Sequence, residues 1–319
     1  MGTEFRIVLY AGESERAQAA AEAAFARVVA LERALSDYDE HSELTRLGTR
    51  SDAVVPTDWI PVSRELGSVL AEAQALARHS GGAFDVTVGP YTRLWRRARR
   101  QGELPRAERL EQARAAVGFQ QLELALDARA ARLHARGMRL DLGGIGKGFA
   151  LDEAFEVLRA KGFTRLLVVG GGELRAGAPP PGQRGWRVRL VGLESPAQEL
   201  ELEHAALATS GDESQALALD ERRHSHILDP RTGEALAERR LVSILGPRAT
   251  LTDGLATAVR VLGTEAGLRF LGQYPEYGAR IQVLRSGRIE ERRSASFPTP
   301  LSCEALLPPG AETTSSLCP

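Results

Sequence analysis

The stretch Asp141-Leu142-Gly143-Gly144-Ile145-Gly146-Lys147-Gly148 decides the fold, because its four glycines join strand-like sequence to a helix. Glycine lets the backbone approach a ligand closely, and a helix N-terminus offers free N–H groups and a partial positive charge. These properties suit a phosphate or a pyrophosphate. The stretch is not a Walker A loop, because glycine rather than Ser or Thr follows Lys147, and it is not a clean dinucleotide fingerprint. Taken alone, a tight turn between a strand and a helix explains it at least as well.

Outward from this turn, strands and helices follow one another along the chain. Hydrophobic spacing predicts a strand at 5–9 and helices at 14–35 and from Ser63, as N-cap, to about residue 80. We expect the helix opened by the glycines to end at Gly162. A hairpin is expected over 131–142, with its turn near 136–137, and a further helix is expected at 252–262. The remaining strands are expected at 166–169, 186–190, 205–209, 223–228, 241–245 and 280–284. Strands outnumber helices and many neighbours suit hairpins, so the sequence predicts an α+β fold with a largely antiparallel sheet.

Composition excludes several classes of protein. The 319 residues allow one large domain or two interleaved lobes, and 41 basic against 42 acidic residues argue against a nucleic-acid-binding surface. The only cysteines are Cys303 and Cys318, which excludes a disulfide scaffold and a cysteine-rich zinc site. No run of about 18 apolar residues occurs, so we expect no membrane span. Past residue 297 the composition turns to Pro, Ser and Thr, which indicates a tail over 298–319.

The segment Thr252-Asp253-Gly254-Leu255-Ala256-Thr257 holds a candidate metal site. Asp253 and Thr257 are four residues apart, so on a helix they share one face. Two hard oxygens there could hold one Mg²⁺, which takes its other ligands from water and substrate phosphates. The alternative is structural: Asp253 would favour the helix dipole in the first turn, and Thr257 would bond its own backbone.

The segment 225–233 contains Asp229-Pro230-Arg231-Thr232-Gly233, a strong turn signal. His226 just before this turn is a candidate general base or acid, although a lone histidine is more often structural. Two shorter stretches are also candidates. Ala208-Thr209-Ser210-Gly211-Asp212 could line a nucleotide site or form a plain turn. In Gly82-Ala83-Phe84-Asp85, Phe84 and Asp85 could contact a heteroaromatic ring or be a core Phe beside a capping Asp.

Taken together and in this order, these stretches resemble the FAD:protein FMN transferases, the ApbE-like family, over residues 1 to 297. The blocks that carry the resemblance are 1–3, 36–39 with 42–44, 82–90, 141–148, 170–173, 208–212, 225–233 and 253–257. The resemblance implies binding of FAD and Mg²⁺ and transfer of FMN to a threonine, sometimes serine, hydroxyl of an acceptor protein, with release of AMP. It also implies an Asp-Gly-x-Thr-like motif in the acceptor.

The resemblance assigns roles residue by residue. His226 matches the histidine thought to activate the acceptor hydroxyl. Metal-ligand positions match Asp253, Thr257 and Gly144, the last only through its carbonyl. Flavin- or nucleotide-contacting positions match Met1, Tyr38, Ala83, Phe84, Asp85, Asp141, Lys147 and Ile227. Some relatives have an acid at the position of Lys147, whose charge suits a phosphate better, and some carry an extra acid at Ala256.

The resemblance also implies an architecture: one domain over 1–297, α+β and T-fold-like, with helices layered on the sheet and the flavin held between two lobes.

Two alternative functions would use the same site. One is Mg²⁺-dependent hydrolysis of FAD to FMN and AMP, and the other is FAD binding without chemistry. Relatives are commonly exported and lipid-anchored, so we expect a cell-envelope location with the leader absent from this chain; a cytoplasmic location is the alternative.

Overall fold

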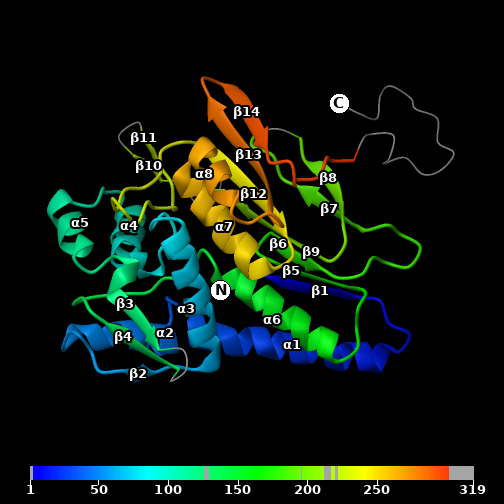
Figure 1. Ribbon diagram of the computed structural model, residues 1–319, viewed down its shortest axis with the longest axis horizontal. Coiled ribbons are helices and arrows are strands. Elements are labelled where there is room, and N and C mark those ends of the chain that lie inside the picture. Colours follow the sequence, from blue (N-terminus) through cyan, green and yellow to red (C-terminus); the bar gives the residue numbers. More distant parts are fainter. Residues whose placement is uncertain (1–2, 126–128, 195, 212–216, 220–221, 302–319) are drawn as a thin grey trace.

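A seven-stranded antiparallel sheet forms the centre of the molecule in the computed structural model, which describes residues 3–125, 129–194, 196–211, 217–219 and 222–301 (Figure 1). Its strand order is β1-β5-β6-β9-β12-β13-β14, and each neighbouring pair runs antiparallel. The strands are β1 (Phe5–Leu9), β5 (Leu166–Gly170), β6 (Glu173–Ala176), β9 (Ala205–Ser210), β12 (Arg240–Gly246), β13 (Gly278–Arg285) and β14 (Arg288–Arg293). The predicted α+β fold with an antiparallel sheet is therefore confirmed.

Both faces of this sheet are apolar, because successive apolar side chains along its strands point alternately to one face and to the other. In β5, Leu166 and Val168 pack into a cluster with α1 and α6, whereas Leu167 and Val169 face a cluster with the β7–β8 hairpin. Because successive side chains of a strand point to opposite faces, one short apolar strand serves both layers. The hairpin strands are β7 (Trp186–Leu190) and β8 (Gln198–Leu202). The sheet is thus a middle layer between helices and a small hairpin.

Helices cover the other face. They are α1 (Ser14–Leu35), α6 (Gly146–Ala160), α7 (Ala249–Leu262) and α8 (Thr264–Leu271). In α1 the buried side chains recur at helical spacing, from Ala20 and Ala24 to Val28, Leu31 and Leu35. Helix α6 lies between α1 and α7, and α7 packs against β9 and β12 (Figure 1). The N-termini of α6 and α7 consequently lie side by side.

A second group of elements lies beside the sheet, at the left of Figure 1. It contains α2 (Glu43–Thr49), α3 (Arg64–His79), α4 (Gly89–Gln101), α5 (Ala107–Arg114), a sheet of β2 (Ile60–Pro61), β4 (Ala130–Leu133) and β3 (Leu122–Ala125), and the pair β10 (Leu217–Leu219) and β11 (Arg222–His224). Three single 3₁₀ turns lie at Arg50–Asp52, Val86–Val88 and Phe119–Gln121. One hydrophobic cluster joins this group to the sheet layer, since it includes Leu70 of α3, Leu255 of α7 and Ile244 of β12.

Most predicted elements are present, with three corrections. The hairpin expected over 131–142 is wrong: β4 pairs backward with β3, and no strand follows residue 133 in that segment. The strand expected over 223–228 ends at His224, because the chain then enters a turn. The helix expected from 252 begins three residues earlier, at Ala249.

Ser63 is the N-cap of α3 as expected, since its hydroxyl accepts a hydrogen bond from the Leu66 N–H at 3.2 Å. Residues 302–319 of the predicted tail lie outside the described residues. Within the ranges that the structure describes, no helix is both long and apolar enough to cross a bilayer.

Candidate active site

A cleft of about 520 Å³ lies between the two groups of elements. This volume is in the range of small-molecule and cofactor sites. The cleft is lined by most of the residues that the sequence singled out: Tyr38, Ala83, Phe84, Asp85, Asp141, Gly144, Lys147, His226, Ile227, Asp253 and Thr257. Met1 lies outside the described residues. The structure therefore brings together residues from five separate stretches of sequence, although their individual roles stay predictions.

Two glycines let α6 approach α7 closely. A Cβ atom on Gly148 would lie only 2.1 Å from the carbonyl oxygen of Ala249, so no other residue fits between the two helices without moving them. A Cβ on Gly144 would lie 3.0 Å from Thr257 Oγ1 and 3.2 Å from the ring of Phe84. The close approach places the backbone of the glycine turn directly against the side chains of α7.

Asp253 is buried, at 4% exposure, between these two helices. Its Oδ2 accepts a hydrogen bond from the Gly148 N–H at 3.0 Å, in the first turn of α6. The structural alternative expected Asp253 to serve the first turn of its own helix; it instead serves the N-terminus of a neighbouring helix. One carboxylate oxygen is thereby fixed and the other, Oδ1, lies on the side of Lys147.

The sequence of the glycine stretch predicts free N–H groups at the start of its helix, which would suit a phosphate, and this prediction is mostly wrong for residues 145–148. Ile145 and Gly146 donate to the carbonyl of Leu142, at 3.0 and 2.7 Å, and Gly148 donates to Asp253. Only the Lys147 amide of this group has no acceptor within the described residues. The turn therefore offers less backbone capacity for an anion than the glycine pattern alone suggested.

Lys147 lies between two carboxylates. Its Nζ is 2.9 Å from Glu173 Oε1 and 3.6 Å from Asp253 Oδ1. Burial alone would lower the pKa of Lys147, but the two carboxylates outweigh it and raise that pKa. Burial, together with the nearby charge of Asp253, raises the pKa of Glu173 to about 8. One cation thus balances two buried acids in this corner of the cleft.

The oxygens here suit a hard divalent cation. Asp253 Oδ1, the Thr257 hydroxyl and the backbone of Gly144 lie in one corner, and the buried Oε2 of Glu173 has no hydrogen-bond partner within the described residues. Mg²⁺ prefers oxygen ligands and commonly takes only one or two carboxylates from the protein. In the described part of the chain no three His, Cys, Asp or Glu side chains converge to form a metal cluster. The residues therefore fit an Mg²⁺ ion that is completed by water and substrate phosphates.

His226 reaches the cleft from a hairpin loop that follows β11. Ser225 and Ile227 pair with Leu236 through backbone hydrogen bonds of 2.9 and 3.0 Å, and Asp229 Oδ1 accepts from the Arg231 N–H at 3.0 Å. The predicted turn at 229–233 is confirmed.

A buried arginine of α7 supports this loop. Arg260 is fully buried, and its guanidinium donates to Ser225 Oγ at 3.4 Å, to the Ser210 carbonyl at 3.2 Å and to the Arg240 carbonyl. The same Ser225 hydroxyl accepts from the Ile227 N–H at 2.9 Å. Arg260 therefore ties the segment around His226, and the end of β9, to the helix that carries Asp253 and Thr257.

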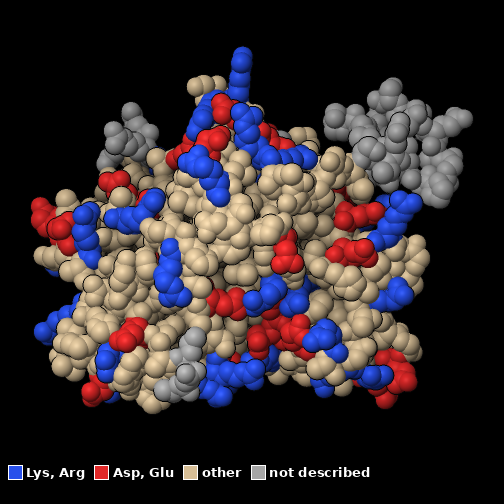
Figure 2. All heavy atoms as spheres, in the orientation of Figure 1, with Lys and Arg blue, Asp and Glu red and all other residues tan. Residues whose placement is uncertain are grey.

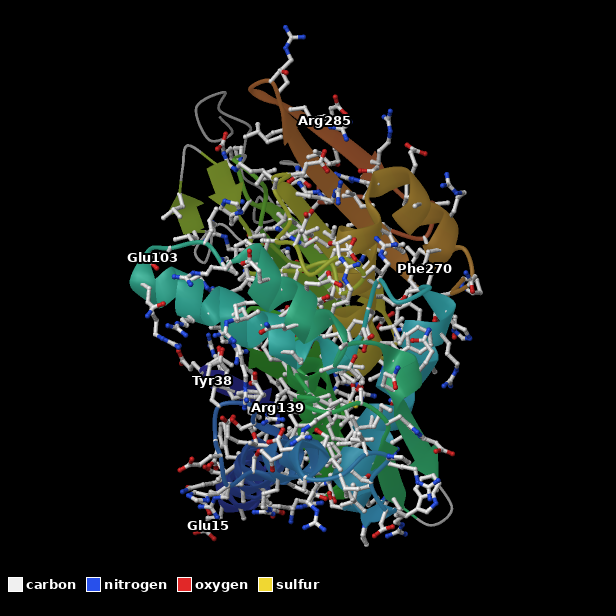
Figure 3. The ribbon with its side chains drawn as sticks, turned by 90° about the vertical axis from the view of Figure 1, so that its left-hand side faces the viewer. Glu15, Tyr38, Glu103, Arg139, Phe270 and Arg285 are labelled. Carbon is white, nitrogen blue, oxygen red and sulfur yellow. The ribbon has the colours of Figure 1, made fainter. Side chains whose placement is uncertain are left out.

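A third part of the cleft wall is aromatic and charged. The Arg96 guanidinium lies 4.1 Å from the centre of the Tyr38 ring, which is 78% exposed. Arg96 also pairs with Asp37 at 2.5 Å and with Asp141 at 3.3 Å. Burial and the neighbouring Asp141 raise the pKa of Asp37, although Arg96 opposes that rise. Figure 3 shows Tyr38 below α4, at the front of the molecule.

Phe84 and Asp85 fit both explanations given for them. Phe84 is 4% exposed and packs in the core, yet it also lines the cleft. Asp85 Oδ1 accepts from the Thr87 N–H at 2.8 Å and from its hydroxyl at 2.7 Å, so it does cap a 3₁₀ turn. Burial raises the pKa of Asp85 despite these hydrogen bonds.

Sequence reasoning missed Glu173, Arg96 and Arg260 as site residues. Glu173 had a usable signal, because it follows three glycines at the end of a predicted strand. Arg96 and Arg260 had none, because each lies on a helix far in sequence from the residues that it contacts.

Comparison with known proteins places this chain in one family. The sequence model described as the ApbE family matches residues 1–281. The chain belongs to the ApbE family. A FAD:protein FMN transferase of Haemophilus influenzae is 30% identical over 244 residues, which is 73% of this chain and 70% of that protein.

Solved ApbE structures have the same fold. The flavinyl transferase ApbE of Pseudomonas stutzeri, in its apo form, superposes with a TM-score of 0.79 at 27% identity, covering 92% of this chain and 95% of that one. The flavin transferase ApbE of Vibrio cholerae gives a TM-score of 0.80 at 28% identity, covering 93% and 95%. The resemblance stated from the sequence is thereby confirmed.

Proposed function

We propose that this ApbE family member transfers the FMN moiety of FAD to a threonine or serine hydroxyl of an acceptor protein and releases AMP in an Mg²⁺-dependent reaction. One observation carries the proposal: a single cleft is lined both by an oxygen-rich corner, formed by Asp253, Thr257 and Gly144, and by His226. A carrier that only stores FAD needs neither. The names of the similar proteins support the same conclusion.

Different residues of the cleft would bind the flavin ring, the phosphates and the metal ion. Tyr38 and Phe84 offer aromatic surface for the flavin ring system, and Lys147 offers positive charge for a phosphate. Asp253, Thr257 and the Gly144 carbonyl would hold Mg²⁺, which neutralises charge on the pyrophosphate and on the departing oxygen. Holding the phosphorus in a fixed position before the acceptor arrives is itself a large part of the rate enhancement.

His226 would act on the acceptor. A threonine hydroxyl is a poor nucleophile at neutral pH, and a neutral imidazole within hydrogen-bond reach can accept its proton, which typically contributes about 10²–10⁴-fold. The acceptor oxygen then bonds to the FMN-side phosphorus while the bond from that phosphorus to the bridging oxygen breaks. AMP leaves with the bridging oxygen, and the proton stays on His226 until it is released to water.

Intact-mass spectrometry tests the proposal directly. An acceptor peptide with an Asp-Gly-x-Thr motif is incubated with the protein, FAD and Mg²⁺, and AMP is quantified in the same tube. We expect an FMN-sized mass gain matched by AMP and abolished by EDTA. AMP without a mass gain would instead assign FAD hydrolysis, and neither product with FAD bound would leave only a carrier.

A further inference from the structure

Helix α4 carries five arginines and no acidic residue. They form two stripes at helical spacing. Arg96 and Arg99 line the cleft together with Thr92, and Arg93, Arg97 and Arg100 form a second stripe that is exposed to solvent. The third side of the helix is apolar and buried, through Tyr91, Trp95 and Ala98. The helix therefore presents one basic stripe to the cleft and one to the outside.

The charges of Asp52 and Asp37 act on Arg93 of the outward stripe (Arg93, Arg97 and Arg100) without forming an ion pair with it. Among the residues that the structure describes, no carboxylate lies within ion-pair distance of these three guanidinium groups, and Arg97 donates only to Gln101, at 2.8 Å. Like charges at helical spacing repel one another by a few tenths of a kcal/mol per pair, which offsets the favourable interaction of Arg100, in the last turn, with the helix dipole. The chain as a whole carries a formal charge of −1, so the stripe is not part of a generally basic surface.

The position of the helix connects the stripe to the site. Trp95 Nε1 donates to the Gly233 carbonyl at 2.8 Å, which fixes α4 to the loop that carries His226. A Cβ on Gly233 would lie 2.6 Å from the ring of Tyr91, so the two elements are in direct contact. Figure 3 shows α4 crossing the front of the molecule above Tyr38. Helix α4 therefore borders the loop from which His226 would act on an acceptor hydroxyl.

We propose that the outward stripe of α4 is a docking surface for an acidic segment of the acceptor protein, next to the residue that receives FMN. This inference rests on the proposed function, because it names the charge of the partner that the site would modify. Surface arginines beside a cleft attract an acidic partner, raise its local concentration and lose this effect as salt increases. Docking outside the cleft would lower the KM for the acceptor without changing the chemical step.

Two acceptor peptides test the proposal. Both carry the same Asp-Gly-x-Thr motif, flanked on each side by four glutamates in one peptide and by four glutamines in the other. FMN transfer is measured for the wild-type protein and for the triple variant Arg93→Gln, Arg97→Gln and Arg100→Gln, at low and at high salt. Glutamine keeps a good helix propensity on this exposed face, so α4 is expected to stay folded.

A matched control removes the same number of positive charges elsewhere. Arg269→Gln, Arg288→Gln and Arg292→Gln change exposed residues of α8 and β14. Acidic and basic side chains are intermixed around that end of the molecule, as Figure 2 shows, and Glu290 lies between Arg288 and Arg292 in the sequence of β14. Because both variants lose the same net charge, a difference between them reports docking at α4 and not a general effect of the protein's net charge on peptide binding.

We expect the wild-type protein at low salt to have a KM about tenfold lower for the glutamate-flanked peptide, with kcat unchanged. This preference should disappear in the α4 variant and at high salt, and persist in the control variant. Equal KM values for the two peptides in the wild-type protein, or an undiminished preference in the α4 variant, would overturn the proposal.

Binding of the fluorescently labelled peptides, measured by anisotropy, separates this inference from the proposed function. If the wild-type protein transfers no FMN to either peptide, the proposed transferase function fails. Docking then still stands if the glutamate-flanked peptide binds the wild-type and control proteins more tightly than the α4 variant. It falls if all three proteins bind this peptide equally.

Discussion

The two sides of the cleft differ in how firmly their side chains are held. On the side of α6 and α7, Asp253 is 4% exposed and fixed by the Gly148 N–H, and Lys147 is held between Asp253 and Glu173. On the side of α4, the Tyr38 ring is 78% exposed and is contacted by Arg96. Phosphates and a metal ion need fixed ligand geometry, whereas a stacking ring tolerates adjustment. The comparison predicts large effects from substitutions on the first side and small effects on the second.

Asp253→Asn should have the largest effect. Asparagine can still accept the hydrogen bond from Gly148, so the packing of α6 on α7 is kept while the charge for Mg²⁺ is lost. We expect the rate of FMN transfer to fall by about 10³-fold or more, with an unchanged circular dichroism spectrum. Retention of more than a tenth of the wild-type rate would show that Asp253 is not a metal ligand.

His226→Ala should lower kcat for FMN transfer by about 10²–10⁴-fold, because the acceptor hydroxyl loses its general base. FAD affinity, measured by titration calorimetry, should stay close to wild type. His79→Ala is a suitable control, since His79 contacts Tyr274 outside the cleft. A wild-type rate for His226→Ala would refute the assignment.

Arg260→Met should have an intermediate effect on both rate and stability. Three acceptors would lose a buried donor, which costs about 1–3 kcal/mol for each group left unsatisfied. We expect a lower unfolding free energy in urea and a kcat about tenfold lower with FAD affinity kept, because the His226 segment loses its support. Arg260→Lys should restore part of kcat. A lower stability with an unchanged kcat would mean that Arg260 has no positioning role.

Arg96→Gln should have the smallest effect. The Tyr38 ring would lose its cation contact, and Asp37 and Asp141 would lose their shared partner. A cation–π contact at an exposed site contributes about 0.5–1 kcal/mol, so we expect FAD affinity to fall about three- to tenfold with kcat nearly unchanged. A loss of 10³-fold would show that this side of the cleft is as rigid as the other, and the comparison would fail.

Local signals in the sequence predicted local structure well. The Ser63 cap and the shared helix face of Asp253 and Thr257 both depend on residues three or four apart. The hairpin expected over 131–142 was wrong because β4 pairs with the strand before it, and a strand's own residues do not specify which neighbour it pairs with. Arg96 and Arg260 were missed for a related reason, since their contacts come from distant segments. The domain boundary at 297 and the cell-envelope location stay predictions.

The contact between Gly148 and Ala249 has a consequence for engineering this protein. Because the two helices are in contact backbone to backbone, the oxygen-rich corner cannot be transferred to another protein as a short motif. Helices α6 and α7 would have to be transferred together. The three arginines of the outward stripe of α4 can be substituted without removing the contacts of Tyr91 and Trp95 with Gly233 or those of Arg96 with Asp37 and Asp141. Redesign of acceptor choice would therefore begin with three surface positions, and redesign of the reaction would require replacing a pair of helices.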